Sequence, residues 1–262
     1  MAAVAGLAVT ACLTATAGPI TVIDVSTAGS SGTANGALFS FADPQPTGTG
    51  YIDPFLREQN TGSEVGVNTS IKAQTVQNTI LYDNKDPVNY THDLQTATLL
   101  PQTGGFFKFA LDANQVANGS ISLIRFQIFE STTAFTDAAA LGAFISTTAP
   151  VVNGTGLAFD MNSGSTKYRV DITSNSGSGS GDMTVLVPSA NFTGTYTYLV
   201  CRLLLEKKNN GFASNDGFEE WTAKTGTPPP TVPDGGSTLL LLGSALIPLG
   251  LLRARREMSS KA

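Results

Sequence analysis

Residues 166–173, TKYRVDIT, alternate between apolar and charged side chains. Every second residue is apolar, at Tyr168, Val170 and Ile172, and the residues between them are charged. Because successive side chains of a β-strand point to opposite faces of a sheet, this pattern predicts a strand with one face in a core and the other in water. Half-solvated strands of this kind are typical of antiparallel sheets. The stretch therefore favours an antiparallel β fold.

Similar stretches recur along the chain as far as residue 223. Most of them alternate apolar and polar residues, and most are bounded by Gly, Asn, Asp or Pro, the residues that favour turns. The further predicted strands are ITVIDV (20–25), GALFSFA (36–42), NTILYD (78–83), GFFKFALD (105–112), SISLIRFQIFE (120–130), MTVLVP (183–188), GTYTYLVCRLLLE (194–206) and GFEEWTA (217–223).

Two stretches depart from simple alternation. The apolar phase of residues 120–130 shifts between Leu123 and Ile124, so this strand carries a β-bulge or is buried on both faces. Only TDAAALGAFI (136–145) has helical character, and it is short. Since no helix recurs between the strands, parallel βαβ units are disfavoured. The sequence predicts an all-β fold, an antiparallel and jelly-roll-like β-sandwich.

The composition suits one domain with a weakly charged surface. Of the 262 residues, 41% are hydrophobic and 13% are charged, which is enough apolar material for one core of about 200 residues. The formal net charge is −5. Four of the 15 basic and two of the 20 acidic residues lie in 232–262, so the rest of the chain has 11 basic and 18 acidic residues, a net charge of −7. Such a body repels phosphate backbones, which argues against nucleic acid as a partner.

The first 17 residues are typical of an export signal. Residues 2–15 are small and apolar, and Ala-Thr-Ala at 15–17 forms an A-x-A cleavage site. The first basic residue is Arg57, whereas signal peptides begin with Lys or Arg, so we expect that the recorded start is trimmed or misplaced. Residues 9–12, VTAC, also resemble a lipoprotein box, but only a stub of apolar chain precedes them. Export by the Sec machinery is the favoured interpretation.

The C-terminal region has three parts in a fixed order. Prolines make residues 225–231 an extended, exposed linker. The apolar run 239–252 has 14 residues, fewer than the roughly 20 that a comfortable bilayer span needs, so it predicts a marginal membrane helix. Arg253, Arg255 and Arg256 follow as a stop on the cytoplasmic side. We therefore expect the body to lie outside the cell and the helix to hold it only transiently at the inner membrane.

The motif VPDGG lies between the linker and the apolar run, at Val232, Pro233, Asp234, Gly235 and Gly236. The motif, the apolar helix and the arginines together resemble the PEP-CTERM type of C-terminal sorting signal, in its V-P-D-x-G variant. The resemblance implies processing by exosortase, a multi-pass membrane enzyme of Gram-negative bacteria. It also implies delivery to the cell surface or to an exopolysaccharide-rich matrix. An ordinary tail anchor is the alternative, although so short a helix would hold poorly.

Three blocks of the body resemble a group of secreted PEP-CTERM proteins of unassigned activity. The blocks are GTGYIDPFLREQ (48–59), SGSGSGDMTVLVP (176–188) and NDGFEEW (215–221), and the resemblance covers most of residues 36–223. It carries no catalytic residues across, but it implies that this body and this tail belong together. The predicted parts are a signal peptide (1–17), a β-sandwich domain (18–224), a Pro-rich linker (225–231) and a sorting signal (232–262).

Two acidic stretches could hold a metal ion. Asn215, Asp216, Glu219 and Glu220 offer oxygen ligands of the kind that Ca²⁺ prefers, beside the end of a predicted strand. A solvated acidic turn explains them equally well. The loop DMNSG (160–164) is a partial match to a calcium loop, for which a plain Asx-turn is the favoured alternative.

A carbohydrate-binding sandwich would stack sugar rings on exposed aromatic side chains. Trp221, Tyr196, Tyr198 and Tyr90 are the candidates. The competing interpretation places Trp221, the single tryptophan, in the core of the last strand.

No constellation of catalytic residues stands out. His92 is the only histidine, and no nucleophile motif accompanies it. Cys201 would be the one thiol left after loss of the signal, and it fits a buried strand position. We therefore expect an exported surface or biofilm-matrix protein without catalytic activity or a required cofactor. Its expected partners are the Sec machinery, exosortase and extracellular polysaccharide; a carbohydrate-binding module, with or without Ca²⁺, is the alternative.

Overall fold

The computed structural model describes the body of the chain with several gaps. The chain divides into two units, Met1–Gly226 and Thr227–Ala262, and every described residue belongs to the first. The predicted signal peptide (1–17), the predicted strand 78–83, the sorting motif and the apolar run all lie outside the described residues. Within the part that is described, no helix is long and apolar enough to cross a membrane. The described residues are 18–42, 53–60, 62–71, 84–85, 89–113, 120–173, 181–206 and 217–226.

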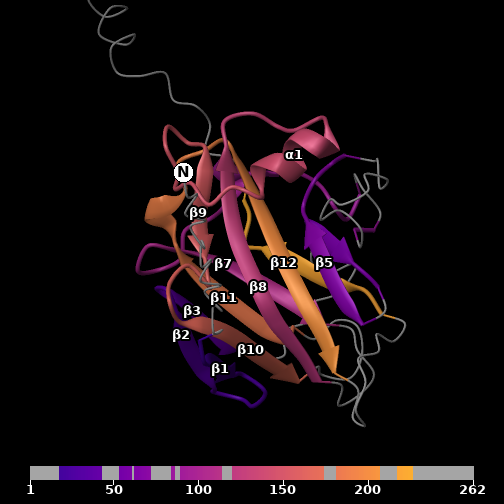
Figure 1. The fold of residues 1–262 in the computed structure, drawn as a ribbon, viewed down its shortest axis with the longest axis vertical. Helices are drawn as coiled ribbons and strands as arrows, with labels where there is room; N and C mark the ends of the chain where they lie inside the picture. The colour runs from indigo at the N-terminus through magenta and orange to yellow at the C-terminus, as the bar shows by residue number, and fades with distance from the viewer. Residues whose placement is uncertain are drawn as a thin grey trace, which may run out of the picture. The chain divides into compact units, whose positions relative to one another are not determined.

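Two mainly antiparallel sheets form the body (Figure 1). The first, called sheet A, has its strands in the order β1 (Ile20–Asp24), β10 (Lys167–Thr173), β8 (Ser120–Ser131), β12 (Tyr196–Glu206) and β5 (Ser63–Val67), with β6 (Leu94–Gln95) paired to β12 and β9 (Gly156–Asp160) paired to β8. The second, called sheet B, has the order β2 (Ser31–Ala34), β3 (Ala37–Phe41), β11 (Met183–Pro188), β7 (Phe106–Ala113), β13 (Glu219–Ala223) and β4 (Leu56–Glu58). The helices are α1 (Ala138–Phe144) and the 3₁₀ turns η1 (Thr96–Thr98) and η2 (Ser189–Asn191).

The predicted β-sandwich is confirmed. Each predicted strand that the structure describes coincides with an observed one, and the predicted helix is α1. The expectation of antiparallel pairing fails at one edge, where β1 runs parallel to β10. No hairpin joins these two strands, so nothing in the connection enforces an antiparallel direction. Strands β2, β4, β5, β6 and β9 are short and were not predicted.

The predicted irregularity of β8 is a bulge at Ile124. In the pairing of β8 with β12, Arg125 lies opposite Arg202 and Leu123 lies opposite Leu203, so Ile124 is the extra residue. The bulge changes which face of the sheet the following side chains occupy. Leu123, before the bulge, and Phe126, after it, both lie in the core between the sheets.

Aromatic side chains from both sheets fill the core. Phe126 of β8 packs against Trp221 of β13, with ring centroids 5.3 Å apart. It also meets Phe39 of β3 at 6.0 Å and Phe109 of β7 at 6.1 Å. All four side chains are fully buried. Because large aromatic side chains bury the most apolar surface, this contact between the sheets dominates the hydrophobic stabilisation of the sandwich.

A second apolar cluster lies on the outer face of sheet A, beneath α1. Phe129 of β8 and Tyr198 of β12 pack there with Leu141 of the helix. Asp137 caps the helix, because its carboxylate accepts a hydrogen bond from the Ala140 N–H at 2.8 Å. Figure 1 shows that α1 lies beside one end of β8 and β12.

Candidate functional site

The aromatic residues proposed for sugar stacking do not form an exposed surface. Trp221 and Tyr198 are both 0% exposed. Trp221 is therefore the core residue of β13 that the alternative interpretation requires, and Tyr198 packs under α1. Tyr196 is half-buried against the same cluster, and Tyr90 lies over the Arg57 guanidinium, with 3.8 Å between the ring centroid and Cζ. The prediction of a stacking platform on these residues is wrong, because the core takes the largest rings.

The proposed calcium ligands are partly outside the described residues and otherwise buried. Asn215 and Asp216 are not described. Glu219 and Glu220 are buried on β13, so they do not form a solvated acidic turn either. The Arg57 guanidinium holds Glu220, with Nε 2.7 Å and Nη2 2.5 Å from Oε1. Among the residues that the structure describes, no group of three or more His, Cys, Asp or Glu side chains could hold a metal ion.

Arg57 ties three segments together at this end of the sandwich. Besides its ion pair with Glu220, its guanidinium lies 3.8 Å from the Tyr90 ring centroid and 4.6 Å from that of Phe218. Such cation–π contacts are worth most where water is excluded, and Arg57 is only 5% exposed. Glu220 is therefore part of a structural clamp rather than a ligand for a cation.

The remaining sequence candidates have structural roles. Asp160 accepts a hydrogen bond from the Asn162 N–H at 2.8 Å, which is the Asx-turn expected as the alternative to a calcium loop. Cys201 is fully buried, and its thiol donates to Glu58 Oε1 at 2.7 Å. Burial raises the pKa of the Cys201 thiol, and the neighbouring Glu58 raises it further. A thiol in such surroundings stays protonated at neutral pH and is a poor nucleophile.

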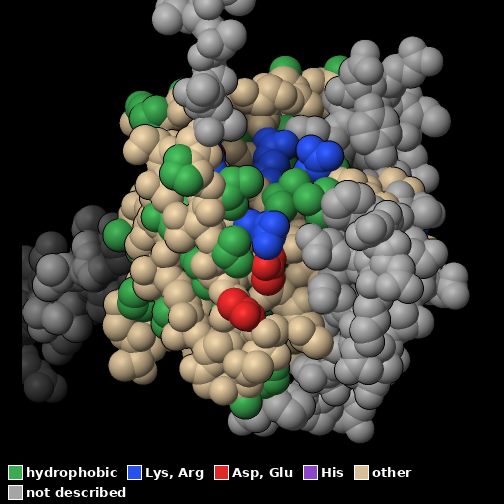
Figure 2. Space-filling view, turned by 60° about the horizontal axis from the view of Figure 1, so that its bottom comes forward, with side chains coloured by type: hydrophobic (Ala, Val, Ile, Leu, Met, Phe, Trp, Pro, Cys, Tyr) green, Lys and Arg blue, Asp and Glu red, His purple; other side chains and the backbone are tan. Residues whose placement is uncertain are grey.

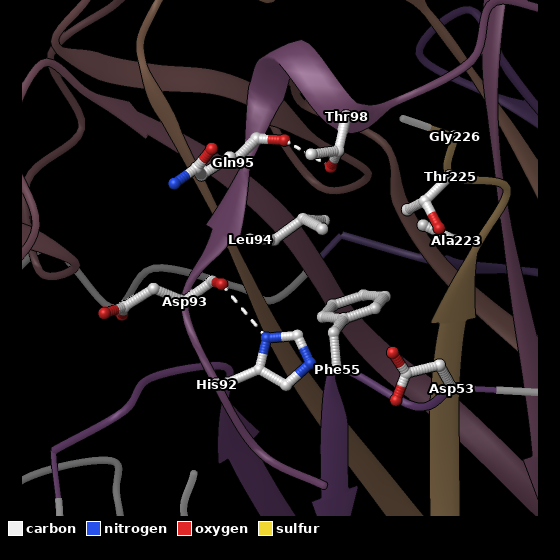
Figure 3. Close-up of a pocket in the computed structure, with 10 residues that line it drawn as sticks. All are labelled: Asp53, Phe55, His92, Asp93, Leu94, Gln95, Thr98, Ala223, Thr225 and Gly226. Carbon is white, nitrogen blue, oxygen red and sulfur yellow. Dashed lines mark hydrogen bonds between the residues drawn. The ribbon is translucent and has the colours of Figure 1, made fainter. Parts of the chain in front are cut away.

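A pocket of about 310 Å³ contains the only histidine of the chain (Figure 3). The Nδ1 atom of His92 lies 3.0 Å from the Asp93 carbonyl oxygen. Because a carbonyl oxygen only accepts, Nδ1 carries a hydrogen, and in neutral imidazole Nε2 is then an acceptor. Figure 3 shows this second nitrogen on the side of Phe55 and Asp53, while the Asp93 carboxylate points away from the pocket.

The pocket offers several polar groups. Thr98, which lines it, donates its hydroxyl to the backbone oxygen of Gln95 at 2.7 Å, and Thr225 lines it as well. Among the described residues, no hydrogen bond joins His92 to either hydroxyl. The pocket can accept hydrogen bonds from a small polar molecule.

The outer face of sheet A carries a feature that the sequence analysis missed. Arg125 of β8, Arg169 of β10 and Arg202 of β12 occupy outward positions on three adjacent strands. Their neighbours in the chain, Phe126, Val170 and Leu203, point into the core instead. Figure 2 shows Lys and Arg side chains gathered at the middle of one face, next to Asp or Glu side chains and surrounded by hydrophobic ones. We call Arg125, Arg169 and Arg202 the arginine face.

The three arginines differ in how they are held. Arg169 makes a two-point contact with Asp171, with Nε 2.7 Å from Oδ1 and Nη2 2.8 Å from Oδ2. Arg125 donates from Nε to Gln127 Oε1 at 2.6 Å, and burial lowers the pKa of its guanidinium while Asp160 raises it and Arg202 lowers it. Arg202 is exposed and donates from Nε to the Ser63 hydroxyl at 2.9 Å.

A signal for the arginine face was present in the sequence. All three arginines lie inside predicted strands, in a chain with only 15 basic residues. Locating Arg125 on the outer face requires the exact position of the bulge, and placing the three side by side requires the strand order. Neither can be read from alternation alone.

No protein-family model, curated protein or solved structure matches this chain.

Proposed function

We propose that this chain is an exported cell-surface or extracellular-matrix protein without catalytic activity, sorted by exosortase through residues 232–262. The observation that carries the proposal is where the sandwich closes. The Gly226 N–H donates to the Thr98 oxygen at 2.9 Å, and the Leu100 N–H donates to the Lys224 oxygen at 2.9 Å. These ties fix Lys224 and Gly226 in the sandwich a few residues before Val232, the first residue of the sorting motif.

The order of linker, motif, apolar run and arginines gives the tail a mechanical role of its own. Proline fixes φ and favours an extended backbone, so residues 227–231 would present the motif as an open peptide segment. The apolar run 239–252 would hold the exported chain at the membrane, and the arginines at 253–256 would stop it there. Cleavage near the motif would then release the sandwich with the hydrogen bonds of Lys224 and Gly226 in place.

The body itself is proposed to be a jelly roll. Taken in chain order, β4, β5, β7, β8, β10, β11, β12 and β13 serve as first to eighth strand. Sheet B then has the order first, eighth, third, sixth, and sheet A has the order second, seventh, fourth, fifth. This is the order of two nested Greek keys, and β1, β2 and β3 extend the two edges beyond it. The fold supports many functions, so the sorting signal and the surface decide the role.

Binding of carbohydrate through stacked rings is not part of the proposal, because Trp221 and Tyr198 are core residues. Calcium assistance is left out for a similar reason. Glu220 already pairs with Arg57, and Glu219 is buried on the same strand.

Intact-mass measurement of the protein recovered from cells tests the sorting proposal. In a host with exosortase, the wild-type chain should lose the residues after the motif, whereas a host lacking the enzyme should keep the full chain in its membranes. Pro233→Ala should also accumulate unprocessed. Pro229→Ala is the matched control, because it removes a linker proline outside the motif and should be processed normally. A surface-exposed chain that retains residues 239–262 would contradict the proposal.

A further inference from the structure

The arginine face places two like charges directly opposite each other. Arg125 and Arg202 are cross-strand partners in the β8–β12 ladder, on the outward side of sheet A. Like charges directly opposite each other destabilise a strand pair. Within the described part of the chain neither arginine forms an ion pair. Arg125 donates to Gln127 Oε1 and to the Ile145 oxygen, and Asp160 acts on it only electrostatically, through the charge that raises its pKa. Such an arrangement is stabilised when an anion binds between the two guanidinium groups.

The donors needed for such an anion are available. Arg202 is an exposed residue that donates only from Nε, to Ser63, so its two Nη groups have no partner among the described residues. Arg169 stands on the next strand beyond β8, and Asp171 holds it rigidly at two points. Adjacent strands are about 4.8 Å apart, so the three arginines form a row roughly 10 Å wide across β12, β8 and β10.

Apolar side chains flank the row. Leu204 lies two residues after Arg202 on β12, and Ile124 is the bulge residue next to Arg125; both are half-buried rather than in the core. Guanidinium donors beside a partly exposed apolar surface suit a ligand that carries carboxylates on rings with an apolar C–H face.

We propose that the arginine face binds an acidic polysaccharide whose sugar rings carry carboxylates. Arg125 and Arg202 hold one carboxylate between them, Arg169 lies toward the next, and Ile124 and Leu204 contact the rings. The inference rests on the proposed function, because an exported chain meets such a polymer outside the cell.

The charge of the rest of the body favours this partner over a nucleic acid. Outside residues 232–262 the chain has a net charge of −7. Duplex DNA carries about one negative charge per 1.7 Å of its axis. Charges act on each other over a Debye length of about 10 Å, so the acidic surface around the arginines would repel most of the phosphates that lie near it. A polyuronate carries one charge per sugar, so a narrow row of arginines can hold it with less opposition from the surrounding surface.

Binding to polygalacturonate, measured by calorimetry on the purified full chain in a non-ionic detergent, tests the inference. Wild type should bind polygalacturonate but not neutral dextran. The double variant Arg125→Gln/Arg202→Gln should lose affinity by roughly tenfold or more, since each lost charge-assisted contact is of that order. Lys108→Gln/Lys224→Gln is the control, because it removes the same charge from β7 and the end of the body and should change affinity less than about twofold.

Several outcomes would overturn the inference. Equal losses in the two double variants would show that only net charge matters. Tighter binding to duplex DNA or to anionic vesicles than to polygalacturonate would show that the partner is another polyanion. The binding assay uses purified full chain that exosortase has not processed, so it is independent of sorting. If the chain is sorted normally but does not bind polygalacturonate, only the inference is rejected. If the chain binds polygalacturonate but is not sorted, only the proposed function is rejected.

Discussion

The outer face of sheet A has two halves built by the same two strands. At one end, Phe129 of β8 and Tyr198 of β12 lie outward beneath α1 and are fully buried. Further along, Arg125 of β8 and Arg202 of β12 lie outward beyond the end of α1, whose C-terminal Ile145 oxygen accepts a hydrogen bond from Arg125. Outward positions of these two strands are therefore apolar beneath the helix and include two opposed arginines beyond its end. We call the two parts the covered and the uncovered half; the covered half is a packed cluster, and the uncovered half carries the proposed anion site.

The bulge at Ile124 decides which side chains of β8 face outward and which face the core. Before the bulge the even-numbered residue Ser122 faces outward, and after it the odd-numbered residues Arg125 and Phe129 do. If the same residues formed a regular strand without the bulge, keeping Leu123 in the core would turn Phe126 outward and Arg125 inward, and keeping Phe126 there would turn Leu123 outward. One inserted residue thus allows β8 to bury its apolar side chains and still present an arginine.

Replacing Phe129 with alanine should have the largest effect, because it removes a fully buried ring from the covered half. The ring packs against Phe144 with 5.7 Å between centroids. Loss of its burial and the resulting cavity should lower the free energy of unfolding by about 3–5 kcal/mol, measured by urea titration. Binding of polygalacturonate below the melting temperature should be unchanged. A parallel loss of affinity in folded protein would contradict the division into a structural and a binding half.

Glu130, the residue after Phe129, faces the other way and makes stability depend on pH. Burial raises the pKa of Glu130 to about 7, against the lowering effect of hydrogen bonds from Thr197 Oγ1 at 2.7 Å, from the Gly194 N–H at 2.8 Å and from Thr96 Oγ1 at 3.2 Å. A Cβ at Gly194 would lie 2.8 Å from Glu130 Oε2, so only glycine lets this N–H approach so closely. The charged form is therefore disfavoured in the folded chain even with three donors.

The sign of the pH effect follows from the raised pKa. Between about pH 5 and pH 8 the folded chain binds the Glu130 proton more tightly than the unfolded chain does, so stability falls as pH rises through this range, by about 3 kcal/mol from this group. Glu130→Gln resembles the protonated carboxyl and should remove that fall. Urea titrations of both proteins across the range give the test: the variant should match wild type near pH 5 and exceed it at pH 8. A difference that is independent of pH would rule out the buried carboxyl as its cause.

The local pattern predicted most of the strands because it reports which residues a pleated sheet can bury. Alternation located β10, and the phase shift after Leu123 indicated that β8 carries a bulge or is buried on both faces, of which the structure shows the bulge. It failed for strands such as β4 (Leu56–Glu58) and β5 (Ser63–Val67). Their charged residues Glu58 and Glu64 are fully buried, so their pattern does not alternate.

The candidate site could not be predicted in the same way, because it depends on contacts between distant segments. The sequence offers both a surface and a core interpretation for Trp221, and the packing of β13 on Phe126 decides for the core. For Tyr198 the packing of α1 on β12 decides. Arg125 and Arg202 are 77 positions apart in the numbering, and only the register of β8 with β12 makes them neighbours. Register is a tertiary property, which local alternation leaves open.

The smallest expected change in stability is also the sharpest test of the uncovered half. Arg202→Gln removes one of the two opposed charges, so it should stabilise the fold by roughly 0.5 kcal/mol while weakening polygalacturonate binding. Arg202→Lys keeps the charge but loses the planar pair of donors, so its stability should match wild type while its affinity still falls. Melting temperatures and calorimetric affinities of the two variants separate these effects. Destabilisation by Arg202→Gln would contradict this expectation. It would show that the hydrogen bond from Arg202 to Ser63 outweighs the repulsion between the two arginines. Arg202 would then be a structural residue and not one that lowers stability in order to bind an anion.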